Sequence, residues 1–475
     1  MPITVVQWNS VGSQLQEADL EAQVQVRTRN QHQEKLGTRG KSRSNGAYLD
    51  GLRGIAMLAV FNYHLLGDGQ SAEDNAATAS TGILGLLHAS WTRLSYMGGN
   101  SAVCFFFFIL TGYVLSLSPL SALAKNQRKQ CRVKVLVGVL RRPLRLYLPV
   151  LIVAFGAAIL MQLPYNVFPD ALWHKREDNL YRELSTFLRL SWDFFQPMRT
   201  VTEADHYAYD PVLWTIPITL KGSLLVYAVL MLFTVVPLSK PYITGILWGT
   251  AIILLHIAYW WQACFIAGLA IAVLGSKIGG IFASSTKPQS QIDTALGYVA
   301  VIISLYLLSA PSYDAHPELA TNILGWKSLV SRVPSAYTAH NYYRFWHSYG
   351  AFILIFGLQY TPIIQQVLTT PPIQHLGNVS FMFYAIHMPF FLCIGDRWKR
   401  VLGRIPFMVE STWYDNLLRI PEWGPKALDL RVFVVYTSIL GMVLVLSRWA
   451  TTYIDEPCGR LCKKVGEGLE KRGLQ

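Results

Sequence analysis

The chain has 475 residues, and its 41 lysines and arginines against 28 aspartates and glutamates give a formal net charge of +13. Only 15% of the residues are charged, 52% are hydrophobic, and the mean hydropathy is +0.31. This balance disfavours a water-soluble globular protein and excludes a disordered or collagen-like chain. The composition therefore predicts an integral membrane protein whose first partner is the lipid bilayer, and no nucleic-acid partner is expected.

Ten windows of largely apolar residues are long enough to cross a bilayer as helices. The fold class expected is an all-α, polytopic membrane bundle of about ten transmembrane helices. The predicted spans lie near residues 51–68, 101–120, 144–162, 214–236, 241–257, 260–276, 292–310, 347–364, 377–395 and 430–451. Residues 82–97 and 184–195 contain tryptophan and charged side chains, which favour helices at the membrane interface.

Charge in the loops predicts the orientation of the bundle. Residues 121–145 contain eight lysines and arginines in one short connection, and cytoplasmic loops have an excess of such residues. We therefore expect this connection, and with ten spans both chain termini, on the cytoplasmic side. The similarly basic segment 396–429 disagrees, because this orientation places it on the opposite side.

The chain divides into three parts on this basis. Residues 1–47 are expected to form a basic, largely disordered cytoplasmic tail, residues 48–452 one multi-span membrane domain, and residues 453–475 a basic cytoplasmic tail. Residues 1–47 lack the apolar stretch of a cleavable signal peptide. Without an obvious sorting signal, the endoplasmic reticulum or another endomembrane is the expected location.

The six cysteines do not suggest a disulfide framework, since three of them fall inside apolar runs and the others flank basic segments. We expect all six to be reduced. Cys458 and Cys462 lie one helical turn apart, but no histidine or further cysteine lies within the spacing of a zinc site. No metal site is predicted.

Arg53 and His64 lie eleven residues apart in the first predicted span. On a helix this spacing is three turns plus about 20°, so both side chains share one face, about 16 Å apart along the axis. Arg53 would lie at the cytoplasmic entrance, and His64 about halfway through the bilayer, where an imidazole can take up a proton near neutral pH. Such a face suits a substrate with an anionic head at Arg53 and a reactive end at His64.

Four further basic positions fall in or near predicted spans. Arg142 and Arg145 share a helical face, and two guanidinium groups at this spacing fit phosphate oxygens, although anchoring at the cytoplasmic interface explains them equally well. His387 is expected at mid-membrane depth, where a lone histidine is more often a packing residue. Lys221 interrupts the fourth span and must reach an interface, find a partner or lose its proton.

Five motifs, in this order along the chain, resemble the acyltransferase-3 family of multi-pass O-acyltransferases, in particular its fungal members. They are Tyr-Leu-Asp-Gly-Leu-Arg-Gly at 48–54 with the spacing from Arg53 to His64, Phe-Phe-Phe-Phe-Ile-Leu-Thr-Gly-Tyr at 105–113, Arg-Arg-Pro-Leu-Arg-Leu-Tyr-Leu-Pro at 141–149, Leu-Trp-Thr-Ile-Pro at 213–217, and Leu-Gly-Asn-Val-Ser-Phe-Met-Phe-Tyr-Ala-Ile-His at 376–387. The likeness covers most of the chain.

The resemblance implies transfer of an acyl group, commonly acetyl, from a coenzyme A thioester to a hydroxyl group. It places His64 at the essential histidine of the family and His387 at another recurrent one, so both are candidate catalytic residues. Arg53, Arg142 and Arg145 match arginines implicated in handling the acyl donor. Acyl-CoA would be a co-substrate, with no tightly bound cofactor. The acceptor would be a small molecule with a hydroxyl group, and the fungal likeness favours a secondary metabolite.

The expected mechanism is direct transfer, in which neutral His64 takes the proton of the acceptor hydroxyl as the oxygen attacks the thioester carbonyl. A covalent acyl-enzyme ranks second, because no Gly-x-Ser-x-Gly motif is present. Relatives usually have a glutamate where this chain has Thr219, which leaves a catalytically impaired relative as an alternative. A proton-coupled transporter with a relay of His64, Lys221 and His387 is another, although buried carboxylates are not evident in the spans.

Overall fold

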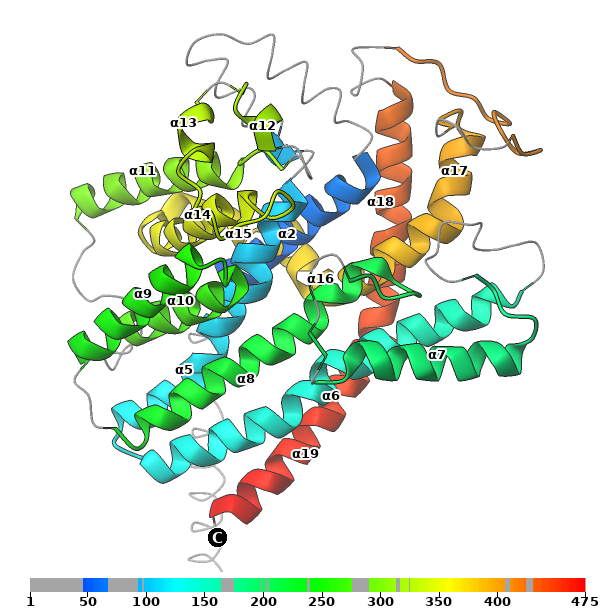
Figure 1. The fold of residues 1–475 in the computed structure, drawn as a ribbon. Helices are drawn as coiled ribbons and strands as arrows, with labels where there is room; N and C mark the ends of the chain where they lie inside the picture. The colour runs from blue at the N-terminus through cyan, green and yellow to red at the C-terminus, as the bar shows by residue number, and fades with distance from the viewer. Residues whose placement is uncertain are drawn as a thin grey trace, which may run out of the picture.

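The protein is a bundle of helices in the computed structural model (Figure 1). The structure describes residues 46–66, 93–95, 98–163, 175–197, 199–200, 202, 205–236, 240–275, 290–312, 317–323, 325–405, 411–423 and 430–474. Within these ranges no strand is present, and the only extended pairing is a single bridge between Tyr207 and Asp210. The all-α fold class is confirmed.

The main helices follow one another with short π-helical and 3-10 turns between some of them. In chain order they are α2 (Ala47–Leu66), α5 (Leu110–Ala124, preceded by the π-helical Val103–Ile109), α6 (Arg128–Met161), α7 (Leu180–Phe195), α8 (Thr215–Phe233, preceded by the 3-10 turn Pro211–Trp214), α9 (Lys240–His256), α10 (Trp260–Gly275), α11 (Gln291–Leu308), α12 (Pro317–Ala320), α13 (Lys327–Val330), α14 (Tyr343–Gly357), α15 (Pro362–Leu368), α16 (Pro371–Phe390), α17 (Asp396–Val401), α18 (Leu430–Ala450) and α19 (Glu456–Leu474).

Each of the ten predicted spans overlaps a helix of this set, and the span predicted at 347–364 covers parts of both α14 and α15. Six helices of the described residues are long and apolar enough to cross a membrane. A seventh span results if Tyr343–Tyr360 and Pro362–Leu368, which meet at a bend of 99°, are counted together. The structure thus supports a polytopic membrane protein, and the number of ten spans stays a prediction.

The interfacial helix predicted at 184–195 is part of α7. Its buried face includes Phe187 and Phe194, whereas Leu188 and Trp192 are exposed. One apolar face packs on the bundle and a second set of apolar side chains is left outside it, as on a helix lying at a membrane surface. The other predicted interfacial helix, at 82–97, lies largely outside the described residues.

Helix α6 begins well before the predicted third span, which was placed at 144–162. It starts at Arg128, so most of the basic connection at 121–145 is helical. At 1.5 Å per residue its 34 residues extend over about 51 Å, more than the hydrocarbon core of a bilayer. The turn before it is formed by Asn126, whose φ of 58° lies in the left-handed region.

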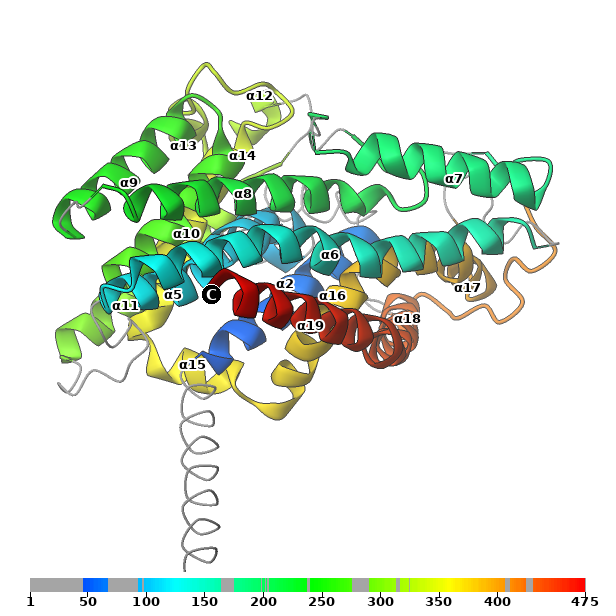
Figure 2. The ribbon, with the colours of Figure 1, turned by 90° about the horizontal axis from the view of Figure 1, so that it is seen from below.

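The basic segment expected as the C-terminal tail contains a helix, α19, joined to α18 by the π-helical turn Thr451–Asp455. Both views of the ribbon show α19 running beside α6 (Figures 1 and 2). Gly466 allows this approach, because a Cβ atom there would lie 2.5 Å from the Cδ atom of Arg141. The end of the chain is therefore packed on the helix that carries Arg142 and Arg145.

Arginines of the segment 396–429, whose charge disagreed with the predicted orientation, have structural partners. Arg400 pairs with Asp415 through two hydrogen bonds, from Nε to Oδ1 at 2.7 Å and from Nη2 to Oδ2 at 3.0 Å. The adjoining Arg431 at the start of α18 donates to Glu422 and to the carbonyl of Gly403. The orientation rule counts lysines and arginines and not net charge, so these pairs leave the disagreement of segment 396–429 with the predicted orientation as it was.

Helices α2 and α16 cross with their backbones in contact. A Cβ atom on Gly54 would lie 2.7 Å from the backbone nitrogen of Gly377, and one on Gly377 would overlap the carbonyl oxygen of Asp50. Small residues at such crossings allow membrane helices to approach closely. This crossing fixes the relative position of the two helices that carry His64 and His387.

Replacing Gly377 by alanine is expected to push α2 away from α16 and to destabilise the protein by about 2 kcal/mol, because the methyl group overlaps backbone atoms that cannot rotate away. Gly441→Ala is the matched control, since nothing lies within 4 Å of a Cβ atom at that helical position. Thermal unfolding in detergent measures both variants. Equal midpoints for the two variants would show that the crossing is looser than described.

Candidate active site

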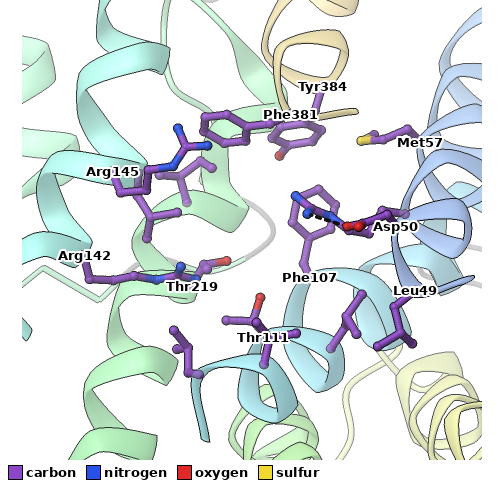
Figure 3. Close-up of a pocket in the computed structure, with 16 residues that line it drawn as sticks. Leu49, Asp50, Met57, Phe107, Thr111, Arg142, Arg145, Thr219, Phe381 and Tyr384 are labelled. Carbon is purple, nitrogen blue, oxygen red and sulfur yellow. Dashed lines mark hydrogen bonds and ion pairs between the residues drawn. The ribbon is translucent and has the colours of Figure 1, made fainter. Parts of the chain in front are cut away.

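A cavity of about 230 Å³ lies among α2, α5, α6, α8 and α16 (Figure 3). Arg53 from α2 and both Arg142 and Arg145 from α6 line it. Figure 3 shows Arg142 and Arg145 on one side of the cavity and Asp50 across from them. The three arginines predicted to handle an acyl donor are therefore brought together around one space, although they come from segments about ninety residues apart.

The arginines have different partners. Arg53 forms an ion pair with Asp50, one turn earlier on α2, at 3.4 Å, and 39% of its side chain is exposed. Arg145 is held by both carboxylate oxygens of Asp455, with Nη2 3.0 Å from Oδ2, and its guanidinium lies 5.5 Å from the centre of the Phe381 ring. Two of the three positive charges thus have a carboxylate beside them.

Arg142 is in contact with a neutral group. Its Nε atom donates to the hydroxyl of Ser223 on α8 at 3.0 Å, and that hydroxyl donates to the carbonyl of Thr219 at 2.6 Å. Helical serines commonly bond the carbonyl four residues earlier, which here leaves the serine oxygen free to accept from the arginine.

His64 and His387 lie next to each other, with their ring centres 5.3 Å apart. His387 is fully buried, and its Nδ1 atom lies 2.8 Å from the carbonyl oxygen of Tyr384 and 3.2 Å from that of Phe383. Since a carbonyl oxygen only accepts, Nδ1 must carry the hydrogen. Nε2 is then the basic nitrogen, and it has no hydrogen-bond partner among the described residues.

A wall of aromatic rings separates the two groups of residues. The rings of Phe107 and Tyr384 are 4.7 Å apart and both line the cavity, while the Tyr384 ring is 6.0 Å from that of His387. Neither His64 nor His387 lines the cavity itself. The structure therefore does not place Arg53 and His64 on one space as expected, because Arg53 lines the cavity and His64 does not.

The Tyr384 side chain is fixed by the segment that precedes α8. Its hydroxyl donates to the carbonyl of Val212 and lies 2.6 Å from the hydroxyl of Thr215. Asp210 caps the turn beginning at Pro211, with Oδ1 accepting from the N–H of Val212 at 3.2 Å. Through these contacts of Tyr384, the motif at 213–217 lies close to the motif at 376–387 that contains His387.

Two carboxyl groups that sequence reasoning did not single out are buried in the same region. Asp210 is 1% exposed, and its Oδ2 atom has no hydrogen-bond partner within the described part of the chain. Glu183 on α7 accepts from the hydroxyl of Tyr209 at 2.6 Å and from the side chain of Gln162 at 3.0 Å. For Asp210 the sequence offered one signal, the Asp-Pro pair at 210–211, because this pair is typical of a helix start.

Asp455, the partner of Arg145, is a third acidic residue that the sequence analysis did not single out. It lies 310 residues from Arg145, in a segment expected to be a tail, so no local pattern relates the two. Lys221, the third member of the relay considered for a transporter, donates to the carbonyl of Arg199. This contact directs Lys221 to the connection before α8, and the described structure gives it no contact with either histidine.

The described residues contain no group of three or more histidine, cysteine, aspartate or glutamate side chains arranged to hold a metal ion. All six cysteines are buried and free. The site as described is built from two histidines, three arginines, hydroxyl groups and aromatic rings. Such groups can move a proton and bind an anionic ligand.

Comparison with known proteins places these features in a family. The family model described as "Acyltransferase domain" matches residues 47–447, which include every residue of the site except Asp455. The chain is 27% identical to the O-acetyltransferase PaAT-1 of Phomopsis amygdali over 75% of this chain and 74% of that protein. It is 24% identical to the acyltransferase clz18 of Cochliobolus lunatus over 87% of this chain and 94% of that protein.

No solved structure matches the chain. The family match spans the whole membrane bundle from α2 into α18, and the resemblance predicted from the five motifs is confirmed. The chain belongs to the acyltransferase-3 family.

Proposed function

We propose that this acyltransferase moves an acyl group, most simply acetyl, from a coenzyme A thioester to a hydroxyl group of a small molecule. The observation that carries the proposal is the convergence of Arg53, Arg142 and Arg145 on one cavity beside a pair of histidines. Guanidinium groups bind phosphate oxygens, and coenzyme A is rich in phosphate. The fungal O-acetyltransferase among its relatives supports acetyl as the group transferred.

His64 is proposed as the general base. It takes the proton of the acceptor hydroxyl as that oxygen attacks the thioester carbonyl, and the thiolate of coenzyme A leaves. His387 carries its hydrogen on Nδ1, so its free Nε2 is available to accept from His64 or from a substrate hydroxyl. The pair can thus hold one proton between two imidazoles during the reaction.

The acyl group must pass the ring wall to reach His64 from the arginine cavity. Phe107 and Tyr384 form that wall, and the hydroxyl of Tyr384 is held by Val212 and Thr215, so a rotation of the Phe107 ring on substrate binding is part of the proposal. Movements of this kind on binding complete many catalytic sites. We also propose that the site lies in an endomembrane such as the endoplasmic reticulum, with the arginine cavity and both termini facing the cytosol, where acyl-CoA is found.

The test uses the purified full chain in nanodiscs with acetyl-CoA labelled in the acetyl group and an extract of hydroxylated metabolites. The expected result is labelled product together with release of coenzyme A, both absent without protein. Proteoliposomes provide the second arm, because a transporter would carry a solute across unmodified. Flux of an unmodified solute without label transfer would overturn the proposed function.

A further inference from the structure

A second cavity, of about 380 Å³, lies along α7 and shares no lining residue with the arginine cavity. One stripe of the helix lines it, with Thr186, Arg189, Leu190 and Asp193 at the spacing of a single helical face. The connections before and after α7 supply the remaining walls. Figures 1 and 2 show α7 beside α6 at an edge of the bundle, so this α7 cavity belongs to the outer surface of the protein.

Hydrogen bonds tie both connections to the helix and define the α7 cavity. Before the helix, Oε1 of Glu177 accepts from the hydroxyl of Thr186 at 3.0 Å. After the helix, the hydroxyl of Tyr207 lies 2.6 Å from that of Ser191. The protein itself therefore holds the walls in place, and binding a ligand there needs little ordering of the chain.

Charges of both signs face the α7 cavity. Arg199 is already paired with Asp205, with Nη2 3.3 Å from Oδ1. Arg189 and Asp193 line the cavity and form no ion pair within the described ranges. Glu177 adds a second carboxylate, whose contact is a neutral hydroxyl. A ligand with a single charge would match one sign and oppose the other, so the cavity suits a ligand that has a negative and a positive group.

Large apolar side chains are exposed on the same helix, next to the stripe that lines the α7 cavity. Leu188 and Trp192 are one turn apart, and Trp192 follows Arg189 by three residues, so these side chains are neighbours on the helix surface. An exposed apolar stripe on a helix at a membrane surface contacts acyl chains. A polar space bordered by such a stripe is suited to a molecule with a polar head and an apolar tail.

We propose that the α7 cavity binds the head group of a zwitterionic phospholipid and so holds α7 at the membrane surface. The phosphate lies at Arg189, because guanidinium groups bind phosphate oxygens, and the ammonium group lies between Asp193 and Glu177. The acyl chains run along Leu188 and Trp192. A volume of about 380 Å³ falls in the range of sites that enclose small ligands. The site is separate from acyl transfer and does not depend on it.

Native mass spectrometry of the full chain in detergent measures the binding of short-chain phosphatidylcholine and of phosphatidylglycerol with the same acyl chains. We expect wild type to bind phosphatidylcholine about tenfold more tightly, because the anionic lipid leaves the carboxylates unmatched. Arg189→Gln and Asp193→Asn should each weaken phosphatidylcholine binding about tenfold. Asp193→Lys should reverse the preference, since it replaces the carboxylate by a cation. Arg182→Gln is the matched control, because Arg182 lies on α7, is exposed and does not line the cavity.

Glycerophosphocholine, which has the head group without acyl chains, separates a lipid from a soluble zwitterion. It should bind about tenfold more weakly than phosphatidylcholine, and Trp192→Ala should weaken binding of the lipid alone. Glycerophosphocholine that binds as tightly as the lipid would overturn the phospholipid as the occupant. A wild-type preference for phosphatidylglycerol, or phosphatidylcholine binding that is as tight in Arg189→Gln and Asp193→Asn as in Arg182→Gln, would overturn the site.

Discussion

Replacing His64 by alanine is expected to lower the rate of acyl transfer by about 100-fold to 10,000-fold, the usual contribution of a general base. A hydroxyl group is a poor nucleophile while it keeps its proton, and in the proposed mechanism His64, whose ring centre lies 5.3 Å from that of His387, takes up that proton. The measurement is the rate of coenzyme A release by purified protein with a hydroxylated acceptor.

The bundle should stay folded in this variant, because the tight crossing of α2 and α16 is made by Gly54 and Gly377. His387→Ala is the informative companion. We expect a smaller loss of rate and an altered pH dependence of kcat/KM, since the change removes the imidazole beside the one that takes up the proton. A monodisperse His64→Ala protein with the wild-type rate would remove His64 from the mechanism.

Breaking the ion pair between Arg400 and Asp415 is expected to destabilise the protein by about 3 kcal/mol. Both side chains are nearly buried, with 5% and 9% exposed, and Asp415 also accepts from the backbone and hydroxyl of Thr412. Asp415→Asn therefore leaves the Arg400 charge without its counter-charge. The comparison variant is Asp178→Asn, whose partner Arg182 is 62% exposed and which should cost less than about 1 kcal/mol.

The same pair has a defined pH dependence. The hydrogen bonds from Arg400 hold the pKa of the Asp415 carboxyl well below its ordinary range. A carboxyl whose pKa is lower in the folded than in the unfolded protein stabilises the fold above the unfolded value, about 3.9, and loses this effect as the pH falls. The stability difference between wild type and Asp415→Asn should be constant from neutral pH to about pH 5 and shrink below about pH 4. A difference that grows on acidification would contradict the pairing.

The helices were predictable because apolar windows of span length leave the backbone few alternatives to a helix in lipid. The positions at which the helices begin and end were less predictable. Helix α6 starts at Arg128, sixteen residues before the predicted span. A basic helical turn and a basic interfacial loop have similar compositions, so the sequence did not distinguish the two. The packing of α19 on α6 depends on Gly466 and Arg141, which are far apart in sequence.

The sequence already singled out the three arginines that line the cavity and the two neighbouring histidines, by residue type, spacing and family resemblance, and their roles in acyl transfer stay predictions. The partners of these residues were not predictable. Asp455 meets Arg145, and His387 meets His64, across more than three hundred residues, and a single sequence contains no signal for such contacts. The ring wall likewise arises where Phe107 of the π-helical segment Val103–Ile109 meets Tyr384 of α16, so the absence of the histidines from the cavity lining appears only in the structure.

The most direct test of acyl transfer through His64 is mass spectrometry of metabolites from three cell lines, one with the wild-type chain, one with His64→Ala and one without the gene. The account predicts a metabolite heavier by one acetyl group in the first line alone, with its free hydroxyl form accumulating in the other two. Acetylated product at equal levels in the wild-type and His64→Ala lines would contradict it.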